Sequence, residues 1–172
     1  MYLSTPLSRG TYLAAKALAV LLTLGLVTLG PPLLLLIGYT FENAGPDGPT
    51  EWVTVLLRIF VSAFAISGAL TSVSMAAASL SDRRAFASIG VVLLALASPA
   101  VASALVEGAE LSPYWRLIDV FSMPFELVFR IFGEPGNFPE LSTSSVVAVN
   151  LFWIAGGLAV VIWRYSRLVV AR

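Results

Sequence analysis

Four long apolar runs make up most of this chain, and the charged residues at their ends sort by sign. One set of run ends has Asp82 as its single acidic residue, and its basic residues are Arg9, Lys16, Arg83, Arg84, Arg164, Arg167 and Arg172. The opposite set has three arginines, Arg58, Arg116 and Arg130, and the acidic residues Glu42, Asp47, Glu51, Glu107, Glu110, Asp119, Glu126, Glu134 and Glu140. Cytoplasmic segments of membrane proteins retain Lys and Arg, so the pattern predicts that both termini lie in the cytoplasm.

The composition argues against a soluble domain. Hydrophobic residues make up 58% of the 172 residues and charged residues 12%, and the mean hydropathy is +0.91. That is more apolar surface than a soluble domain of this size can bury. The net charge of zero gives no support to nucleic-acid binding. The chain has no Cys and no His, and therefore neither thiol chemistry nor the usual zinc ligands, so we expect no metal and no cofactor.

The apolar runs predict four transmembrane helices, over residues 12–39, 53–80, 85–106 and 146–163. Residues 17–37 carry no charge, and as a helix they would extend about 31 Å, which matches the core of a bilayer. That length exceeds the apolar part of a signal peptide, so we interpret this run as a retained span. Pro31 and Pro32 remove two backbone donors within it and predict a kink.

Small and weakly polar residues recur in the second and fourth spans. Those that we expect at helix contacts are Gly68, Ser72, Ala76, Asn150, Gly156 and Gly157. Small residues let a second helix approach closely, and Ser or Asn side chains hydrogen-bond across the contact. The same residues could line a substrate path, but helix packing is the interpretation that we favour.

Residues 113–133, between the third and fourth spans, are too charged to cross a bilayer. The aromatic residues of this segment are Tyr114, Trp115, Phe121, Phe125, Phe129 and Phe132. The last three follow helical spacing. On the polar side, Arg116 can pair with Asp119, and Glu126 can pair with Arg130. Pro124 predicts a break into two short helices. These helices either lie in the outer interface as an anchor or dip into the membrane and return, and periodicity leaves both alternatives open.

No sequence motif for catalysis or ATP binding is present. The chain has no G-x-x-x-x-G-K-[ST], no H-E-x-x-H and no G-x-S-x-G. No charged residue lies at the middle of a predicted span, where one would cost about 2.5–3.5 kcal/mol on insertion scales and would mark an ion or proton path. We therefore expect no catalytic residue and no enzymatic activity, and any transport must draw its energy from another subunit.

The N-terminal residues carry a motif at the cytoplasmic edge of the first span. A Pro-apolar-Ser-Arg element, a Tyr and a Lys follow one another as Pro6, Leu7, Ser8, Arg9, Tyr12 and Lys16. A small-residue span, a Ser-rich basic turn at residues 79–84, a further span and a Leu-Ser-Pro element at residues 111–113 come after it in order. In these motifs, over essentially its whole length, the chain resembles the permeases of type-2 ATP-binding-cassette (ABC) exporters. It departs from the family at Thr5, where an Arg often precedes the proline.

The resemblance implies an all-α integral membrane protein of the prokaryotic plasma membrane, surrounded by membrane lipids, in which residues 113–133 form paired extracellular gate helices. It implies a permease with two kinds of partner: an ABC ATPase subunit, and a second permease copy or a homologous permease. The family's first two spans and its coupling helix have no counterpart here, so we expect the chain alone neither to hold nor to stimulate an ATPase. The alternative function is that of a non-transporting membrane scaffold or accessory protein.

Overall fold

The structure is a computed structural model that describes residues 9–81 and 84–167. Within these ranges the chain is helical and contains no strand. Its elements are α1 (Arg9–Phe41), α2 (Pro49–Leu80), α3 (Arg84–Ser103), the π-helical turn η1 (Ala104–Gly108), the 3-10 turn η2 (Pro113–Ile118), α4 (Ser122–Phe132) and α5 (Thr143–Ser166). Four helices are long and apolar enough to cross a membrane, over Gly10–Phe41, Pro49–Leu80, Ala85–Gly108 and Thr143–Ser166. The predicted all-α fold with four membrane-spanning helices is confirmed.

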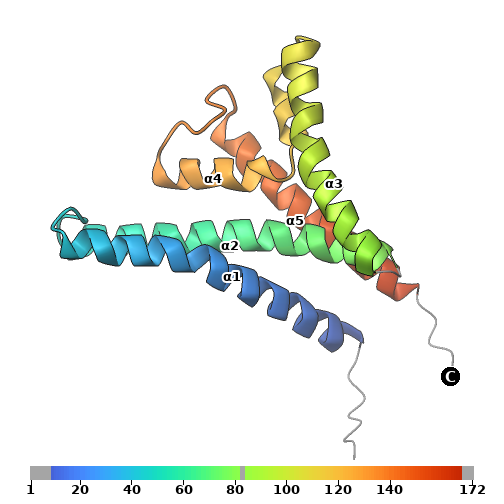
Figure 1. Cartoon of the computed structure of the whole chain (residues 1–172), viewed down its shortest axis with the longest axis horizontal. Helices are drawn as coiled ribbons and strands as arrows, with labels where there is room; N and C mark the ends of the chain where they lie inside the picture. The colour runs from blue at the N-terminus through green and yellow to red at the C-terminus, as the bar shows by residue number, and fades with distance from the viewer. Residues whose placement is uncertain (1–8, 82–83, 168–172) are drawn as a thin grey trace, which may run out of the picture.

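Helix α2 is the centre of the arrangement. Helix α1 pairs with it as an antiparallel hairpin, α5 crosses it, and α4 lies alongside it (Figure 1). The hairpin is joined near its loop by the indole of Trp52, which donates to Thr40 Oγ1 over 3.2 Å, and further along by Thr28 Oγ1, which lies 3.5 Å from Ala63 O. Beyond these contacts the N-terminal part of α1 diverges from α2.

The polarity of the interior and the surface is that of a membrane protein. Large apolar side chains point outward, including Leu26 at 73% exposed and Leu34 at 71%. The buried residues include many polar side chains, which are Ser62, Ser67, Thr71, Ser72, Ser98, Asp119, Glu126 and Asn150. Lipid accepts an apolar exterior, whereas buried polar groups in an apolar surrounding need hydrogen-bond partners within the protein.

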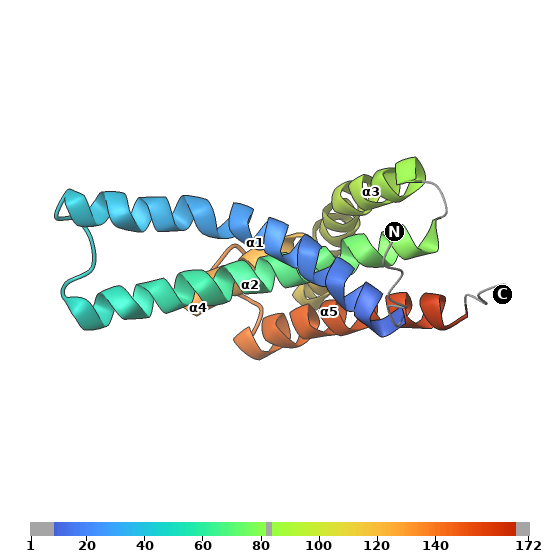
Figure 2. The same cartoon turned by 90° about the horizontal axis from the view of Figure 1, so that it is seen from below.

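The basic run ends that the structure describes gather in space. The first turns of α1, the end of α2 and the end of α5 lie at one end of the molecule (Figure 2), and Arg164 Nε donates to the carbonyl of Ser79 over 3.3 Å. This grouping agrees with the sorting of charges along the sequence. Pro6, Leu7 and Ser8 of the N-terminal motif, with Asp82, Arg83 and Arg172, lie outside the described residues.

Two helices begin before the spans predicted for them. Helix α5 begins at Thr143, earlier than the apolar run suggested, because Ser142 Oγ accepts a hydrogen bond from Ser145 N over 3.2 Å and caps the helix. Helix α2 likewise begins early, with Pro49 in the first helical position, where a missing N–H is tolerated.

Pro31 and Pro32 lie inside α1, which continues through both and changes direction along its length (Figure 2). Each removes one helical hydrogen bond, so they are the residues in α1 that favour a bend.

Candidate functional site

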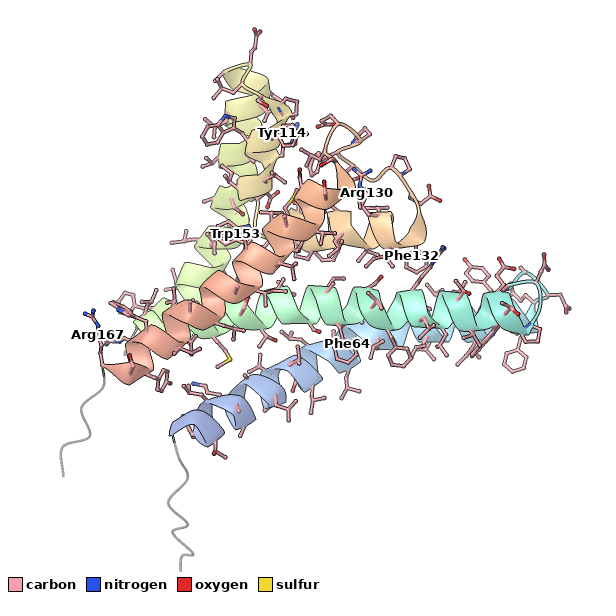
Figure 3. The ribbon with its side chains drawn as sticks, turned by 180° about the vertical axis from the view of Figure 1, so that it is seen from behind. Phe64, Tyr114, Arg130, Phe132, Trp153 and Arg167 are labelled. Carbon is pink, nitrogen blue, oxygen red and sulfur yellow. The ribbon has the colours of Figure 1, made fainter. Side chains whose placement is uncertain are left out.

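Residues 113–133, here called the gate segment, comprise η2 and α4 and the short connection between them. They pack against the sides of α2 and α5, and η2 also contacts α3. Figure 3 shows Tyr114 on η2, and Arg130 and Phe132 on α4, with Trp153 on the adjoining α5. The indole of Trp153 lies 3.5 Å from the carbonyl of Leu117, which links α5 to η2.

The break within the gate segment lies at Asp119, and the predicted break at Pro124 is wrong. Asp119 is buried, and its Oδ1 accepts from the backbone N–H groups of Phe121 over 3.2 Å and Ser122 over 3.1 Å. An Asp that binds backbone amides two and three residues ahead stabilises a turn. Pro124 instead occupies the first turn of α4, where no partner exists for an N–H.

Asp119 also connects the gate segment to α3. Ser98 Oγ donates to Asp119 Oδ1 over 3.2 Å. The predicted pair between Arg116 and Asp119 is therefore not formed. Arg116 instead contacts Glu107 Oε1 at 2.6 Å and lies 3.8 Å from Glu140, so it joins η1, η2 and the connection before α5.

A buried ion pair holds the second half of the gate segment. Glu126 is 0% exposed, and its Oε1 accepts from Arg130 Nη2 over 2.9 Å, at the predicted i,i+4 spacing. Its second oxygen accepts from the backbone of Asn137 over 2.9 Å, and Arg130 also donates to the carbonyl of Phe138 over 2.8 Å. The connection to α5 thus supplies one backbone hydrogen-bond partner to each member of the ion pair.

Gly136 makes this connection possible. Its φ is +70°, and a Cβ at this position would overlap the carboxylate of Glu126. A glycine adopts positive φ without strain and leaves room for the carboxylate. The sequence signal was a Gly following a Pro in an exterior loop, but the close approach of Glu126 depends on tertiary structure.

The aromatic face of α4 is oriented away from the rest of the chain. Phe125 is 50% exposed and Phe129 38%, while Phe121 and Phe132 are half-buried and Tyr114 and Trp115 are exposed on η2. The charged side of α4 faces inward instead. This orientation reverses the usual one of an amphipathic helix on a soluble core, and it leaves aromatic rings available to lipid, substrate or another subunit.

Two residues outside the gate segment hold it in place. Arg58 of α2 donates to the carbonyl of Phe132 over 3.4 Å, and its guanidinium lies 6.0 Å from the Phe132 ring. Asn150 of α5 is buried, and its Nδ2 donates to the carbonyls of Met123 over 3.0 Å and Val146 over 2.8 Å. From the sequence, Arg58 was only one of three arginines at the acidic run ends, and its contact with Phe132 was not predicted.

The contact between α2 and α5 is built on small residues. A Cβ at Gly157 would lie 2.8 Å from the carbonyl oxygen of Ser72, so the two backbones approach as closely as glycine allows. Ser72 is buried, and its hydroxyl lies 2.8 Å from Ala69 O and 3.4 Å from Trp153 O. A Cβ at Gly68 would lie at an ordinary 3.6 Å from Ile154 Cδ1. Such a contact is typical of small-residue packing between membrane helices.

Ala76 and Gly156 lie beside this contact and line an apolar cavity of about 350 Å³ between α2, α3 and α5.

Among the described residues no cluster of three acidic, His or Cys side chains could hold a metal ion. Comparisons with protein-family models, with curated proteins and with solved structures found no match for this chain.

Proposed function

We propose that the chain is the transmembrane permease part of an ATP-driven ABC exporter, in which the gate segment controls the exit of substrate. The observation that carries the proposal is that this segment contacts three different spans. Asp119 connects it to α3, Arg58 of α2 contacts its last turn, and Asn150 of α5 binds its middle. A small unit held by three helices moves whenever those helices move relative to one another.

Such an arrangement suits transport by rigid-body motion. Export requires that rearrangement of the spans opens a route on the outer side, and ATP binding in the partner subunit shifts the population toward that open state. The chain has no phosphate-binding loop, so ATP binding belongs to a separate ATPase subunit. In this proposal the basic end faces the cytoplasm of a prokaryote, and a second permease copy or a homologous permease completes the pathway.

The exposed rings of α4 supply the test. In the complex with its ATPase subunit, Phe125 and Phe129 are replaced together by Ala. The amount of substrate exported per ATP hydrolysed should fall several-fold, because the outward aromatic face is lost. Phe60 and Phe64 of α2 provide the matched control, since they are exposed and also four residues apart. Transport and ATPase rates in proteoliposomes are the measurement. Equal rates for the wild type and both double variants would reduce the gate segment to an anchor.

The alternative is a membrane scaffold or accessory protein. One observation favours it: the small and polar residues of α2 and α5 are used in packing, as at Ser72 and Gly157. Affinity purification of the tagged protein from its native membrane separates the two functions. A permease co-purifies from that membrane with the second permease and the nucleotide-binding subunit that the complete complex holds, and a scaffold co-purifies with neither.

A further inference from the structure

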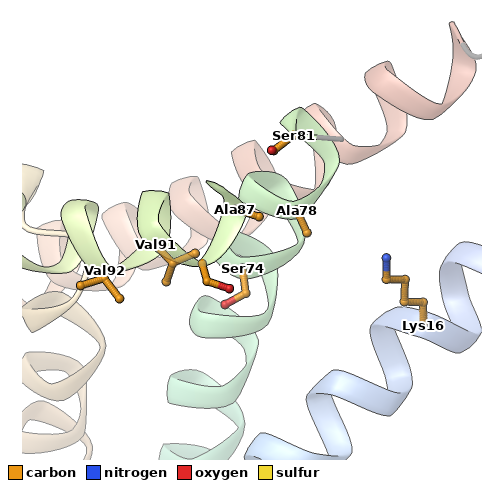
Figure 4. Close-up of a pocket in the computed structure, with 8 residues that line it drawn as sticks. Lys16, Ser74, Ala78, Ser81, Ala87, Val91 and Val92 are labelled. Atoms are coloured by element: carbon orange, nitrogen blue, oxygen red, sulfur yellow. The ribbon is translucent and has the colours of Figure 1, made fainter. Parts of the chain in front are cut away.

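A cavity of about 550 Å³ lies between the N-terminal part of α1 and the corner formed by α2 and α3 (Figure 4). It is lined by Lys16 from α1, by Ser74 and Ala78 from α2, and by Ser88, Val91 and Val92 from α3, together with neighbouring residues. It arises where α1 diverges from α2. Its volume falls within the range of small-molecule sites, about 300–1000 Å³.

The lining carries its one charged side chain, Lys16, at one end, and its other end is lined by valines and by the small side chains of Ser74 and Ser88. Lys16 and Ser81 lie toward the basic end of the molecule, and Ser81 directly follows the last residue of α2. Val91 and Val92 lie about two helical turns into α3 and are apolar. A ligand that fits this gradient has a charged head and an apolar body.

The positive charge of Lys16 indicates that the head group of the ligand is negatively charged. It is the single lysine of the chain, and among the described residues no carboxylate forms an ion pair with it. A long cationic side chain at the edge of a span reaches toward the headgroup region, where lipid phosphates lie. The complementary partner is therefore an anion at the membrane surface.

We propose that this cavity binds one anionic phospholipid from the leaflet at the basic end, with its phosphate at Lys16 and an acyl chain along Val91 and Val92. A protein helix fits less well. A partner helix would need an acidic residue at the headgroup level to meet Lys16, whereas an anionic lipid already carries its phosphate there.

Native mass spectrometry of the purified protein tests the site directly, and it needs neither an ATPase nor the proposed transport function. The protein is extracted from vesicles that contain equal amounts of phosphatidylglycerol and phosphatidylcholine, and the retained molecules of each lipid are counted. We expect the wild type to retain phosphatidylglycerol preferentially. Lys16→Gln should lower that preference about fivefold, the effect of one Lys near an anionic surface, while Lys16→Arg keeps it.

Arg167→Gln is the matched control for charge. Arg167 lies at the same end of the molecule, but its guanidinium stacks 4.4 Å from the ring of Trp163 and lies outside the cavity. We expect its loss to leave the lipid preference unchanged. Equal losses in Lys16→Gln and Arg167→Gln would mean diffuse attraction to a basic surface and would overturn the proposal. So would equal retention of the two lipids by the wild type.

A second pair of variants tests the place of the acyl chain. Ala87→Phe adds a ring inside the cavity, whereas Ala85→Phe adds one on the same helix outside it. We expect the first to reduce the retained phosphatidylglycerol to background and the second to leave it unchanged, with equal thermal unfolding temperatures as the check on folding. Full retention in Ala87→Phe would show that the cavity does not hold the lipid.

Discussion

Helix α1, which forms a hairpin with α2, and the gate segment both pack against α2, yet different interactions hold them. The hairpin presents its large side chains outward and is joined by few polar contacts, such as that between Trp52 and Thr40. The gate segment turns its rings outward and its charges inward, with Glu126 completely buried. A membrane span is thus defined by its composition and length, whereas a short charged helix stays in place through specific partners.

The largest expected effect tests the buried charge of the gate segment. Glu126→Ala removes one partner of the ion pair. The side chain of Arg130, which is 11% exposed, then stays buried without a carboxylate beside it. Breaking a buried pair in this way costs about 3–5 kcal/mol. We expect a clearly lower thermal unfolding temperature in lipid nanodiscs and faster proteolysis of the connection around Asn137.

Glu134→Ala is the control for that variant, because Glu134 is exposed just beyond α4. Its loss should change stability by no more than about 0.5 kcal/mol, as for surface positions in general. If the two variants unfold at the same temperature, the inward charges do not hold the gate segment, and the contrast with the hairpin fails.

The second test concerns the packing of α2 against α5, which carries both regions. Gly157→Ala places a methyl group 2.8 Å from the carbonyl of Ser72 and forces the helices apart, at a cost of about 1–3 kcal/mol. Gly156→Ala is the matched neighbour, since a Cβ there meets no atom within 4 Å. Because Ala is the better helix former by about 0.8–1.0 kcal/mol, Gly156→Ala should be neutral or stabilising.

Thermal unfolding of both glycine variants in the same lipid is the measurement. Opposite shifts are the expected result. Equal shifts would show that the close approach at Gly157 does not limit the packing of α5 on α2. The small-residue contact would then add no stability beyond that of other helix contacts.

These contrasts also explain which parts of the structure the sequence could predict. The four spans follow from apolar length, and the gate segment stands out because its charges forbid a span. The spacing of Glu126 and Arg130 was enough to predict their pair. The partners of Arg116 and Asp119 were not predictable, because Glu107 lies nine residues before Arg116 and Ser98 lies 21 residues before Asp119, and the fold alone brings them together.

The orientation of α4 was unpredictable for a different reason. Helical spacing puts Phe125 and Phe129 on one face but does not say whether that face meets protein or lipid. In water the rings would turn inward. Beside a bilayer, burial of the Glu126 carboxylate with its two hydrogen-bonded neighbours, Arg130 and Asn137, competes with burial of the rings, and the structure places the charge inside. The choice depends on Gly136 and on the connection to α5, which local periodicity does not include.

The smallest expected effect tests α1, the other region of the comparison with the gate segment. Leu26 of α1 is 73% exposed, so Leu26→Ala removes little contact within the chain. A span held by composition should tolerate this change within about 0.5 kcal/mol, whereas Leu141→Ala in the cluster beside α4, at 2% exposed, should cost about 2–5 kcal/mol. Thermal unfolding of the two variants in nanodiscs gives the comparison. A loss in Leu26→Ala as large as that in Leu141→Ala would mean that this face of α1 packs against another protein rather than lipid, and size-exclusion chromatography of the wild type would then show whether that protein is a second copy of the chain.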